Sequence, residues 1–368
     1  MTTVNYGTTI QLYPNKKQKE QIDKTIGCKR FVYNYFLNEA NINKYKSYNK
    51  YSKLLTQLKI DKPFLREVDK FALQNALKDL DDSFKRFFNK QNKYPKFKSK
   101  KDLRQSYRTN LTNKNIEIKG SLIKLPKLSW VKIKKELNIN KINNVTVFKK
   151  GRKYYVSISC ETKLNNILKE KNIPKPKNYA IGIDLGISDY AILSDGTKYP
   201  NHKYFKKYEK KLIKLQKQLS RCQKNSNNYT KLKSRINKLH SKIANTRKDY
   251  LHKLSKTIIN ENQVIVVESL KIKNMIKNPK LAKHIQDCSW GRFLNYLEYK
   301  STWYGRDFIK INTYFPSSQL CSSCGYKNKE VKDLKIRHWE CPICGVNHDR
   351  DINSAINIKK EGLKLLMF

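Results

Sequence analysis

The sequence predicts a multidomain α+β protein, and three observations carry that prediction. Two Cys-x-x-Cys pairs between residues 321 and 344 predict a local metal-binding ribbon. An apolar stripe at 3.6-residue spacing within residues 69–88 predicts a packed helix. The β-branched run QVIVVESL at residues 263–270 predicts a buried central strand. At 368 residues the chain is long enough for two or three domains with cores of their own.

The amino-terminal half predicts a β domain with inserted helices. Residues 1–12 alternate apolar and polar side chains, which indicates a strand, and helical periodicity follows over residues 13–93. Asp69 marks a helix start. The stripe after it consists of Leu73, Ala76, Leu77, Leu80, Phe84, Phe87 and Phe88. Residues 94–176 predict the remaining strands and, from Lys163 onward, a charged linker with two prolines.

The strands expected within residues 94–176 are short β-type runs separated by turn residues. They cover Ile116–Ile118, Leu122–Leu125, Val145–Phe148 and Tyr154–Cys160. If the first strand of the chain pairs with these runs, the helices of residues 13–93 are an insertion in one β domain.

Residues 177–320 predict a second domain that contains both strands and helices. The segment NYAIGIDLGISDYAILSDG (178–196) predicts a hairpin with Asp184 on its first strand. Residues 204–260 are basic and helical, and the NSNN break at 225–228 makes them an antiparallel helical hairpin. The run at 263–270 contains Glu268 at its end, and buried strands seldom carry a glutamate without a use for it.

The ribbon, residues 321–347, predicts a structural zinc site. A glycine follows each Cys-x-x-Cys pair, so each pair can turn two thiolates toward one ion. Four thiolates close a tetrahedral shell, which is typical of structural zinc. The expected ligands are Cys321, Cys324, Cys341 and Cys344. The alternatives are four unrelated buried thiols or two disulfides. The other cysteines, Cys28, Cys160, Cys222 and Cys288, are expected to be reduced and ordinary.

The charge of the chain predicts a polyanionic partner. It carries 79 Lys and Arg against 30 Asp and Glu, a net charge of +49. Nucleic acid is the natural partner for such a charge, and an anionic membrane surface is the alternative. No apolar run approaches the roughly 20 residues that span a bilayer, and the amino terminus lacks the apolar region of a signal peptide. We therefore expect a soluble, cytoplasmic protein that does not enter membranes.

Three acidic residues stand out by their context. Asp184 and Glu268 belong to predicted strands, and Asp351 follows the ribbon in an HDRD segment. Carboxylates at strand ends and on a following helix can converge on two Mg²⁺ ions about 3.5–4 Å apart and promote phosphodiester cleavage. Hard oxygen ligands suit Mg²⁺ or Mn²⁺. Taken singly, each carboxylate could equally be a helix cap or a surface residue.

Several segments together resemble the TnpB family. IGIDLGISDYAI, VVESLKIKNM and SSQLCSSCG…CPICGVNHDRDINSAINI are similar to its three nuclease segments and zinc ribbon. CKRFVYNYFL, VDKFALQNALKDLDDSFKRFF and YPKFKSKK resemble its amino-terminal half more loosely. TnpB comprises the OrfB-type proteins of bacterial and archaeal insertion sequences, which resemble miniature type V CRISPR effectors.

The resemblance implies a specific fold. A RuvC-like, RNase H-type α/β nuclease domain (177–320 and 348–368) would contain an inserted zinc ribbon (321–347). A wedge β-barrel (1–12 and 94–176) would carry a helical recognition domain (13–93). Asp184, Glu268 and Asp351 would bind the catalytic metal. Asp351 is preferred to Asp349 because the family's ligand precedes x-Asn-x-Ala.

The resemblance also implies a function. The protein would bind a guide RNA made from the end of its element, recognise a short target-adjacent motif, and cut double-stranded DNA paired with the guide, with a monomer favoured. The alternatives are a transposase that acts directly on DNA strands and a guided DNA-binding regulator without cleavage. The candidates for nucleic-acid contact are Arg30, Tyr33, Lys78, Arg86, Lys96, Arg104 and Tyr107.

Overall fold

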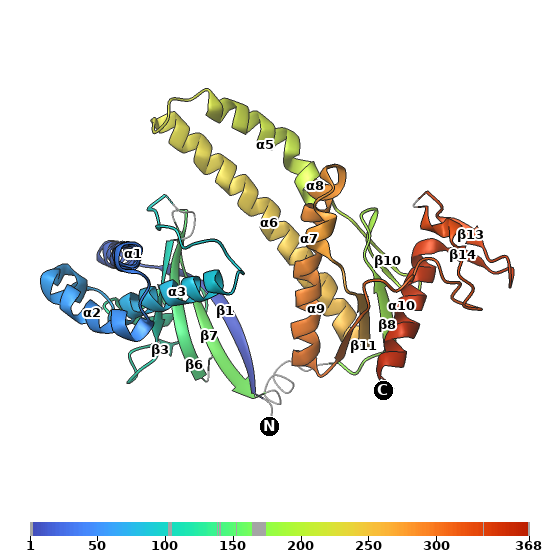
Figure 1. The fold of residues 1–368 in the computed structure, drawn as a ribbon, viewed down its shortest axis with the longest axis horizontal. Coiled ribbons are helices and arrows are strands. Elements are labelled where there is room, and N and C mark those ends of the chain that lie inside the picture. Colours follow the sequence, from blue (N-terminus) through green and yellow to red (C-terminus); the bar gives the residue numbers. More distant parts are fainter. Residues whose placement is uncertain are drawn as a thin grey trace. The chain divides into compact units, whose positions relative to one another are not determined.

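The chain divides into two compact units, residues 1–164 and 165–368 (Figure 1). The computed structural model describes residues 3–101, 105–137, 139, 141–151, 153–163, 174–333 and 335–366. Each unit has its own sheet and hydrophobic core. The division between the units lies in the predicted linker, of which residues 164–173 are outside the described part of the chain.

The first unit contains a long helical insertion between its first two strands. Its elements are β1 (Thr3–Tyr13), α1 (Lys16–Asn43), α2 (Tyr48–Asp61), the 3₁₀ turn η1 (Pro63–Glu67), α3 (Lys70–Phe88), β2 (Gln105–Asn110), β3 (Glu117–Lys119), β4 (Leu122–Leu125), β5 (Ser129–Ile133), β6 (Lys141–Lys150) and β7 (Lys153–Lys163).

These strands form one seven-stranded antiparallel sheet in the order β2-β6-β7-β1-β5-β4-β3. β1 pairs with β7 from Thr3 opposite Lys163 to Leu12 opposite Tyr154. The first strand therefore belongs to the same sheet as the later ones, and the prediction that the helices are inserted in a β domain is confirmed. Alternate side chains such as Ile10, Val156 and Ile158 fill its core.

The helix start predicted at Asp69 is confirmed, because its side chain accepts a 3.0 Å hydrogen bond from the Phe71 N–H at the start of α3. Asn15 and Gln18 form a capping box at the start of α1, which was not predicted. The predicted apolar stripe of α3 is buried only as far as Phe84, because Phe88 lies in the last turn and is 58 % exposed.

Two strands of the first unit escaped prediction. β2 lies in a segment that is basic and polar enough to resemble a loop, and β5 carries only five residues. The alternation that identifies β2 is short, because only Tyr107 and Thr109 point into the core.

The second unit begins with a strand hairpin and ends with a helix. Its elements are β8 (Asn178–Asp184), β9 (Asp189–Leu193), β10 (Lys198–Pro200), α5 (Tyr204–Ser220), α6 (Asn227–Glu261), β11 (Asn262–Glu268), α7 (Ile272–Met275), α8 (Pro279–Cys288), α9 (Trp290–Tyr304), β12 (Asp307–Ile311), the 3₁₀ turn η2 (Glu330–Lys332), β13 (His338–Glu340), β14 (Asn347–Asp349) and α10 (Arg350–Leu366).

A five-stranded sheet in the order β10-β9-β8-β11-β12 forms the centre of this unit. β11 runs parallel to both of its neighbours, β8 and β12, as predicted for a central strand. Its alternate residues serve two cores: Ile265 and Val267 pack with α6 and α9, whereas Val264 and Val266 pack with α10. The sheet is therefore covered by helices on both faces (Figure 1).

Two glycines let α10 lie directly on the sheet. A Cβ atom on Gly182 of β8 would lie 2.1 Å from the carbonyl oxygen of Ala355, and one on Gly362 of α10 would lie 2.2 Å from Cγ1 of Val266. No side chain larger than hydrogen fits at either contact. The position of α10, and of every residue at its amino-terminal end, therefore depends on this close approach.

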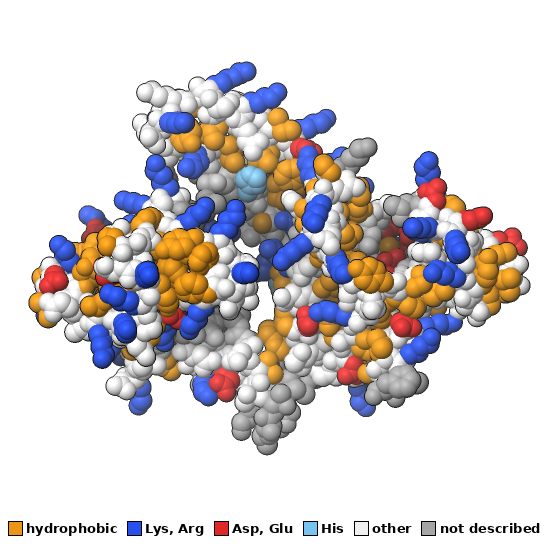
Figure 2. Space-filling view, viewed as in Figure 1, with side chains coloured by type: hydrophobic (Ala, Val, Ile, Leu, Met, Phe, Trp, Pro, Cys, Tyr) orange, Lys and Arg blue, Asp and Glu red, His pale blue; other side chains and the backbone are white. Residues whose placement is uncertain are grey.

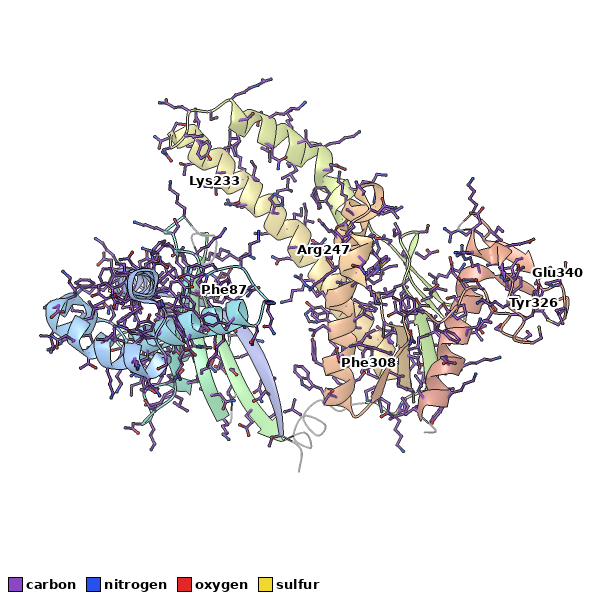
Figure 3. The ribbon with its side chains drawn as sticks, in the orientation of Figure 1. Phe87, Lys233, Arg247, Phe308, Tyr326 and Glu340 are labelled. Carbon is purple, nitrogen blue, oxygen red and sulfur yellow. The ribbon has the colours of Figure 1, made fainter. Side chains whose placement is uncertain are left out.

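The predicted helical hairpin is confirmed as α5 and α6, which lie side by side (Figure 1). Leu212, Ile236, Leu239 and Ile243 form its apolar seam. At its base Arg247, labelled in Figure 3, donates to the Asp287 carboxylate of α8 at 2.9 Å. Among the described residues, no helix is long and apolar enough to cross a membrane.

Candidate metal sites

The four ribbon cysteines form one cluster. Their Sγ atoms all lie within 4.8 Å of one another, with 3.6 Å between Cys321 and Cys344 and also between Cys324 and Cys341. Tetrahedral zinc with Zn–S bonds of about 2.3 Å places its sulfurs about 3.8 Å apart, so the donor set and the spacing fit such an ion. The alternative of two disulfides is wrong for this structure, because all eight cysteines are free.

Tight turns build the cluster from local sequence. The N–H groups of Gly325 and Gly345 donate to the carbonyls of Cys321 and Cys341, at 3.0 and 2.8 Å. Both glycines have positive φ angles, 81° and 68°, which favour glycine over residues that carry a Cβ atom. The glycine after each cysteine pair is thus required by the turn that aims the thiols inward.

The histidine of the HDRD segment contacts the cluster at Cys321, which cysteine spacing does not reveal. His348 is buried against Trp339, and its Nε2 lies 3.1 Å from Sγ of Cys321. Burial raises the pKa of Cys321, but the N–H groups of Cys324 and Ser323 and the His348 ring outweigh this effect and lower the pKa to about 5. Cys321 thus favours the thiolate that a metal requires. The pKa values of Cys324 and Cys344 are raised instead, because the effect of the backbone N–H groups beside them is outweighed by burial and by hydrogen bonds to neighbouring thiols.

Asp184 and Glu268 lie at the carboxyl ends of neighbouring parallel strands. Ile183 of β8 is registered opposite Val267 of β11, so the next residue of each strand is one of the two carboxylates. Carboxyl ends of parallel strands are the usual ligand-binding edge of such sheets. Strand register therefore brings together two residues that are 84 positions apart in the sequence.

Asp349 and Asp351 have different roles at the start of α10. The Asp349 carboxylate accepts from the N–H groups of Asp351 and Ile352, at 3.0 and 3.1 Å, and pairs with Lys198 at 2.6 Å. Burial raises the pKa of Asp349, but Lys198 and these N–H groups outweigh burial and lower it. Asp349 is therefore occupied as a helix cap. Asp351 makes a longer pair, at 3.3 Å, with the half-exposed Arg337 of the ribbon.

Two buried serines link the strand carboxylates. The Ser317 hydroxyl donates to Glu268, and the Ser354 hydroxyl lies 3.0 Å from that of Ser317 and also within hydrogen-bond reach of Asp184, where its one proton can serve either partner. Ser317 precedes the ribbon and Ser354 belongs to α10. The four side chains thus form one contiguous polar cluster that holds Asp184 and Glu268 in relation to the helix that carries Asp351.

Two asparagines of α10 hold the segment that leads into the ribbon. Asn353 donates to the carbonyl of Leu320 at 2.7 Å and accepts from the N–H of Ser322 at 2.9 Å. Asn357, one turn later, donates to the carbonyls of Ser317 and Leu320. Both side chains are buried. The ribbon's entry is therefore attached to the same helix as the third carboxylate.

Glu268 and Asp351 are close enough to Asp184 to influence its charge. Burial, followed by the negative charges of Glu268 and Asp351, raises the pKa of Asp184 to about 7. Burial likewise raises the pKa of Glu268, against the effect of the Ser317 hydroxyl. All three side chains are partly exposed, so an ion could reach them. A bound cation would stabilise their charged forms.

The carboxylates are more widely spaced than the thiols. Within the part of the chain that the structure describes, the cysteines are the only group of three or more potential ligands whose donor atoms all lie within 4.8 Å. The three carboxylates therefore do not form a cluster as tight as that of the cysteines.

The predicted nucleic-acid contacts of the first unit divide into accessible and buried residues. The accessible or partly accessible ones are Arg30, Lys78, Arg86 and Lys96. The predictions for Tyr33 and Tyr107 are wrong, because these rings are only 3 % and 1 % exposed and cannot stack on a base. Tyr33 packs among the helices, and Tyr107 points into the core beneath β2. Arg104 lies outside the described residues.

Three family models match the chain. One described as a probable transposase of the OrfB type covers residues 157–279, and one described as a Cas12f1-like TNB domain covers residues 290–358. A model described as a helix-turn-helix domain covers residues 1–50. There the structure contains strand β1, the 28-residue helix α1 and the start of α2.

Two curated relatives match nearly the whole chain. A Streptomyces pristinaespiralis protein named "Putative RNA-guided DNA endonuclease" is 36% identical over 99% of this chain and 90% of its own. InsQ of Escherichia coli, which bears the same description, is 33% identical over 97% of this chain and 92% of its own.

A solved structure shares the fold. It is described as the cryo-EM structure of the Cas12f1–sgRNA–target DNA complex. Its protein matches with a TM-score of 0.63 and 13% identity, and the match covers 97% of this chain and 98% of that one. The two chains thus share the multidomain α+β architecture, although only 13% of their residues are identical.

Proposed function

Because the chain belongs to the TnpB family, we propose that it is an RNA-guided, metal-dependent DNA endonuclease of a transposable element. It cuts double-stranded DNA that is complementary to a bound guide RNA and lies next to a short target-adjacent motif. Base pairing supplies the sequence specificity, and the protein contacts the shape and backbone of the heteroduplex.

The observation that carries this proposal is the meeting of three carboxylates from distant segments. Asp184 and Glu268 share a sheet edge, and Asp351 interacts electrostatically with Asp184 from α10. We assign all three as ligands of Mg²⁺, or of Mn²⁺, because hard cations take carboxylate oxygens. When bound, such ions activate a water molecule and stabilise the leaving oxygen of the phosphodiester.

The surrounding residues prepare these ligands for a cation. The hydroxyls of Ser317 and Ser354 orient the strand carboxylates, and the contacts of Gly182 and Gly362 hold α10 against the sheet. The pKa of Asp184 is raised first by burial and then by the negative charges of Glu268 and Asp351. This is the electrostatic state that a divalent cation would relieve.

We assign the ribbon cysteines to one structural Zn²⁺. Four thiolates leave no open coordination position, so the ion would supply folding energy and no chemistry. The ion would hold the two segments that flank it. The segment before the ribbon is bound by Asn353 and Asn357, and the segment after it leads to Asp351, which pairs with Arg337 of the ribbon.

The domain assignment follows the two units. Residues 177–320 and 348–368 are assigned to a RuvC-like nuclease domain with the ribbon, 321–347, inserted. Residues 1–12 and 94–176 are assigned to a wedge β-barrel, and residues 13–93 to a recognition domain. The antiparallel sheet with its inserted helices and the parallel strands beneath α10 support this division.

The charge of the protein supports a complex with both RNA and DNA. Lys and Arg side chains are spread over the visible surface of both units, and acidic ones are few (Figure 2). On the helical hairpin, Lys233 and other basic residues extend into solvent (Figure 3). Each phosphate that such residues neutralise releases counterions, so the affinity is expected to fall with salt.

The test is guided cleavage by the protein with its own RNA. The chain is co-expressed with its native downstream DNA and purified, its RNA is sequenced, and a plasmid carrying the matching target is incubated in Mg²⁺ or in EDTA. We expect one dominant RNA with a fixed scaffold and a variable segment, and cleavage only in Mg²⁺. Asp184→Ala should abolish cleavage and leave RNA and DNA binding near normal.

Asp195→Ala is the matched control, since Asp195 is an exposed carboxylate in the turn between β9 and β10. Its cleavage should equal that of the parent protein. Cleavage that survives Asp184→Ala would contradict the metal-site assignment. Guided binding without any cut in Mg²⁺ would support a regulator instead, and cleavage that needs no RNA would support a DNA-only transposase.

A further inference from the structure

Two loops extend past the carboxyl ends of β11 and β12, next to Glu268. They are joined by hydrogen bonds: the Ser269 N–H donates to the carbonyl of Ile311 at 3.2 Å, and the Thr313 hydroxyl donates to the carbonyl of Ser269 at 2.6 Å. Glu268 and Ile311 are themselves registered partners in the sheet. The loops are therefore an ordered continuation of the edge that carries the candidate metal ligands.

Tyr314 projects from the second loop. It is 79 % exposed, the largest value among the exposed large hydrophobic side chains of the described residues. Its backbone N–H donates to Oδ1 of Asn312 at 2.9 Å. The Lys271 ammonium donates to its hydroxyl at 2.8 Å and lies 4.5 Å from its ring centroid. The ring is thus both open to solvent and held in one orientation.

Both residues of the pair lie close to the registered partners Glu268 and Ile311, each along its own strand. Lys271 is three residues beyond Glu268, and Tyr314 is three residues beyond Ile311. Three residues span at most about 11 Å. Stacked nucleotides rise about 3.4 Å each along a strand. A strand with a phosphate at the carboxylates would therefore have another nucleotide within reach of this pair.

The chemistry of the pair matches a nucleic-acid strand. An exposed, oriented aromatic ring stacks on a base of any sequence, and an adjacent ammonium attracts a phosphate. The segment SLKIKNMIKNPK, residues 269–280, contains four lysines and no acidic residue, so the local charge favours an anion. A surface cation–π pair stabilises a fold by only about 0.5–1 kcal/mol, so folding gives little reason for it.

We propose that Tyr314 and Lys271 bind the single DNA strand that enters the carboxylate site, with a base stacked on Tyr314 and a phosphate against Lys271. The inference deepens the proposed function and rests on it for the identity of the strand, because the strand at a DNA-cutting site is DNA. Stacking requires an unpaired base, so the contact is made with a single strand and not with a duplex.

The experiment measures strand binding apart from cleavage. Full-length protein in EDTA is titrated into a fluorescein-labelled single-stranded DNA oligonucleotide, and a second oligonucleotide carries 2-aminopurine, whose fluorescence changes on stacking. The variants are Tyr314→Ala, Tyr314→Phe and Lys271→Ala. The control is Tyr179→Ala, since Tyr179 is 70 % exposed at the amino-terminal end of β8, away from the carboxyl edge.

We expect Tyr314→Ala to weaken single-strand binding by about tenfold and to remove the 2-aminopurine signal, with Tyr314→Phe close to the parent. Lys271→Ala should weaken binding severalfold and reduce the salt slope by about 0.7. Tyr179→Ala should behave as the parent. In Mg²⁺, Tyr314→Ala should slow guided cleavage through a higher KM more than through a lower kcat.

Equal binding by Tyr314→Ala and Tyr179→Ala would overturn the inference. So would an equal loss of affinity for single-stranded DNA, duplex DNA and an RNA oligonucleotide in Tyr314→Ala. If the parent protein makes no guided cut but its single-strand binding still depends on Tyr314, the proposed function fails and the strand contact stands. The two proposals can therefore fail separately.

Discussion

The cysteine cluster and the carboxylate group are two candidate cation sites of one unit, built in opposite ways. The cysteines come from a single segment, and their sulfurs lie within 4.8 Å of one another because of two local glycine turns. The carboxylates come from β8, β11 and α10, and they depend on strand register, two serines and a helix packed on glycine. The four-cysteine site can be formed by residues of one short segment, whereas the carboxylate site must be positioned by elements from distant parts of the chain.

This difference has a physical reason. Four thiolates around zinc satisfy the ion completely, and metal binding itself supplies the free energy that folds the turns. Carboxylates that must leave room for water and substrate are costly to keep charged, because burial and, after it, repulsion by Glu268 and Asp351 raise the pKa of Asp184. The surrounding fold must then oppose that repulsion. The predictions below test the comparison, from the largest expected effect to the smallest.

The strongest test separates the two aspartates that flank Arg350. Asp351→Asn removes a ligand charge from the carboxylate site and should reduce single-turnover cleavage by at least about a thousandfold, comparable to the loss of a major electrostatic contact. Asp349→Asn is the matched control. Asn caps a helix about as well as Asp, so only the Lys198 pair is lost and the rate should stay within severalfold. Equal losses would remove the distinction between cap and ligand.

The second test removes one ligand from the four-cysteine site. Cys341→Ser removes one thiolate and should abolish zinc binding, measured as metal content of the purified protein. Cleavage should fall by at least about tenfold, because the segments around Asp351 lose their support. RNA affinity should fall less. Cys222→Ser, at a partly exposed cysteine after α5, should change neither quantity. An equal loss of RNA affinity would mean that the ribbon supports the whole protein.

The third test moves the helix that carries Asp351. Gly182→Ala places a methyl group 2.1 Å from the carbonyl oxygen of Ala355 and should destabilise the second unit by about 1–3 kcal/mol in urea unfolding. Cleavage should fall further than this loss of folded protein explains. Gly27→Ala in α1, where a Cβ meets nothing within 4 Å, should instead stabilise its helix by about 0.5–1 kcal/mol. Opposite signs at the two glycines are the expected result.

The smallest effect concerns pH in the absence of metal. The folded pKa of Asp184 is raised from 3.8 to about 7, so folding favours its protonated form. That stabilisation is present at low pH and is lost as pH rises through about 7. In EDTA, Tm should therefore fall by roughly 4–8 °C between pH 5.5 and 8, the shift that about 2 kcal/mol produces in a domain of this size.

Mg²⁺ should cancel this fall in Tm, because it stabilises the ionised carboxylates. Asp184→Asn should lack the pH-dependent part of Tm and respond less to Mg²⁺. A Tm that rises between pH 5.5 and 8 in EDTA, in the parent but not in Asp184→Asn, would show that the site favours the ionised form without a cation.

Much of the four-cysteine site and of the element order follows from the sequence alone. Cysteine spacing and the glycines predict the ribbon, because its geometry is decided within a few residues. The strand hairpin at β8 and β9 and the helical hairpin at α5 and α6 follow from hydrophobic periodicity and turn residues. The net charge of +49 indicates a polyanionic partner without any structural knowledge.

Only the tertiary structure decides which side chains meet. The register of β8 against β11 places Asp184 beside Glu268, and no local pattern encodes a pairing across 84 residues. The same holds for the Ser317–Ser354 contact and for the role of Asp349 as the cap of α10, whereas the preference for Asp351 as the ligand already followed from the family resemblance. The sequence also suggested that Tyr33 and Tyr107 contact nucleic acid, but both are buried. Burial depends on what packs against a residue and not on its neighbours in the sequence.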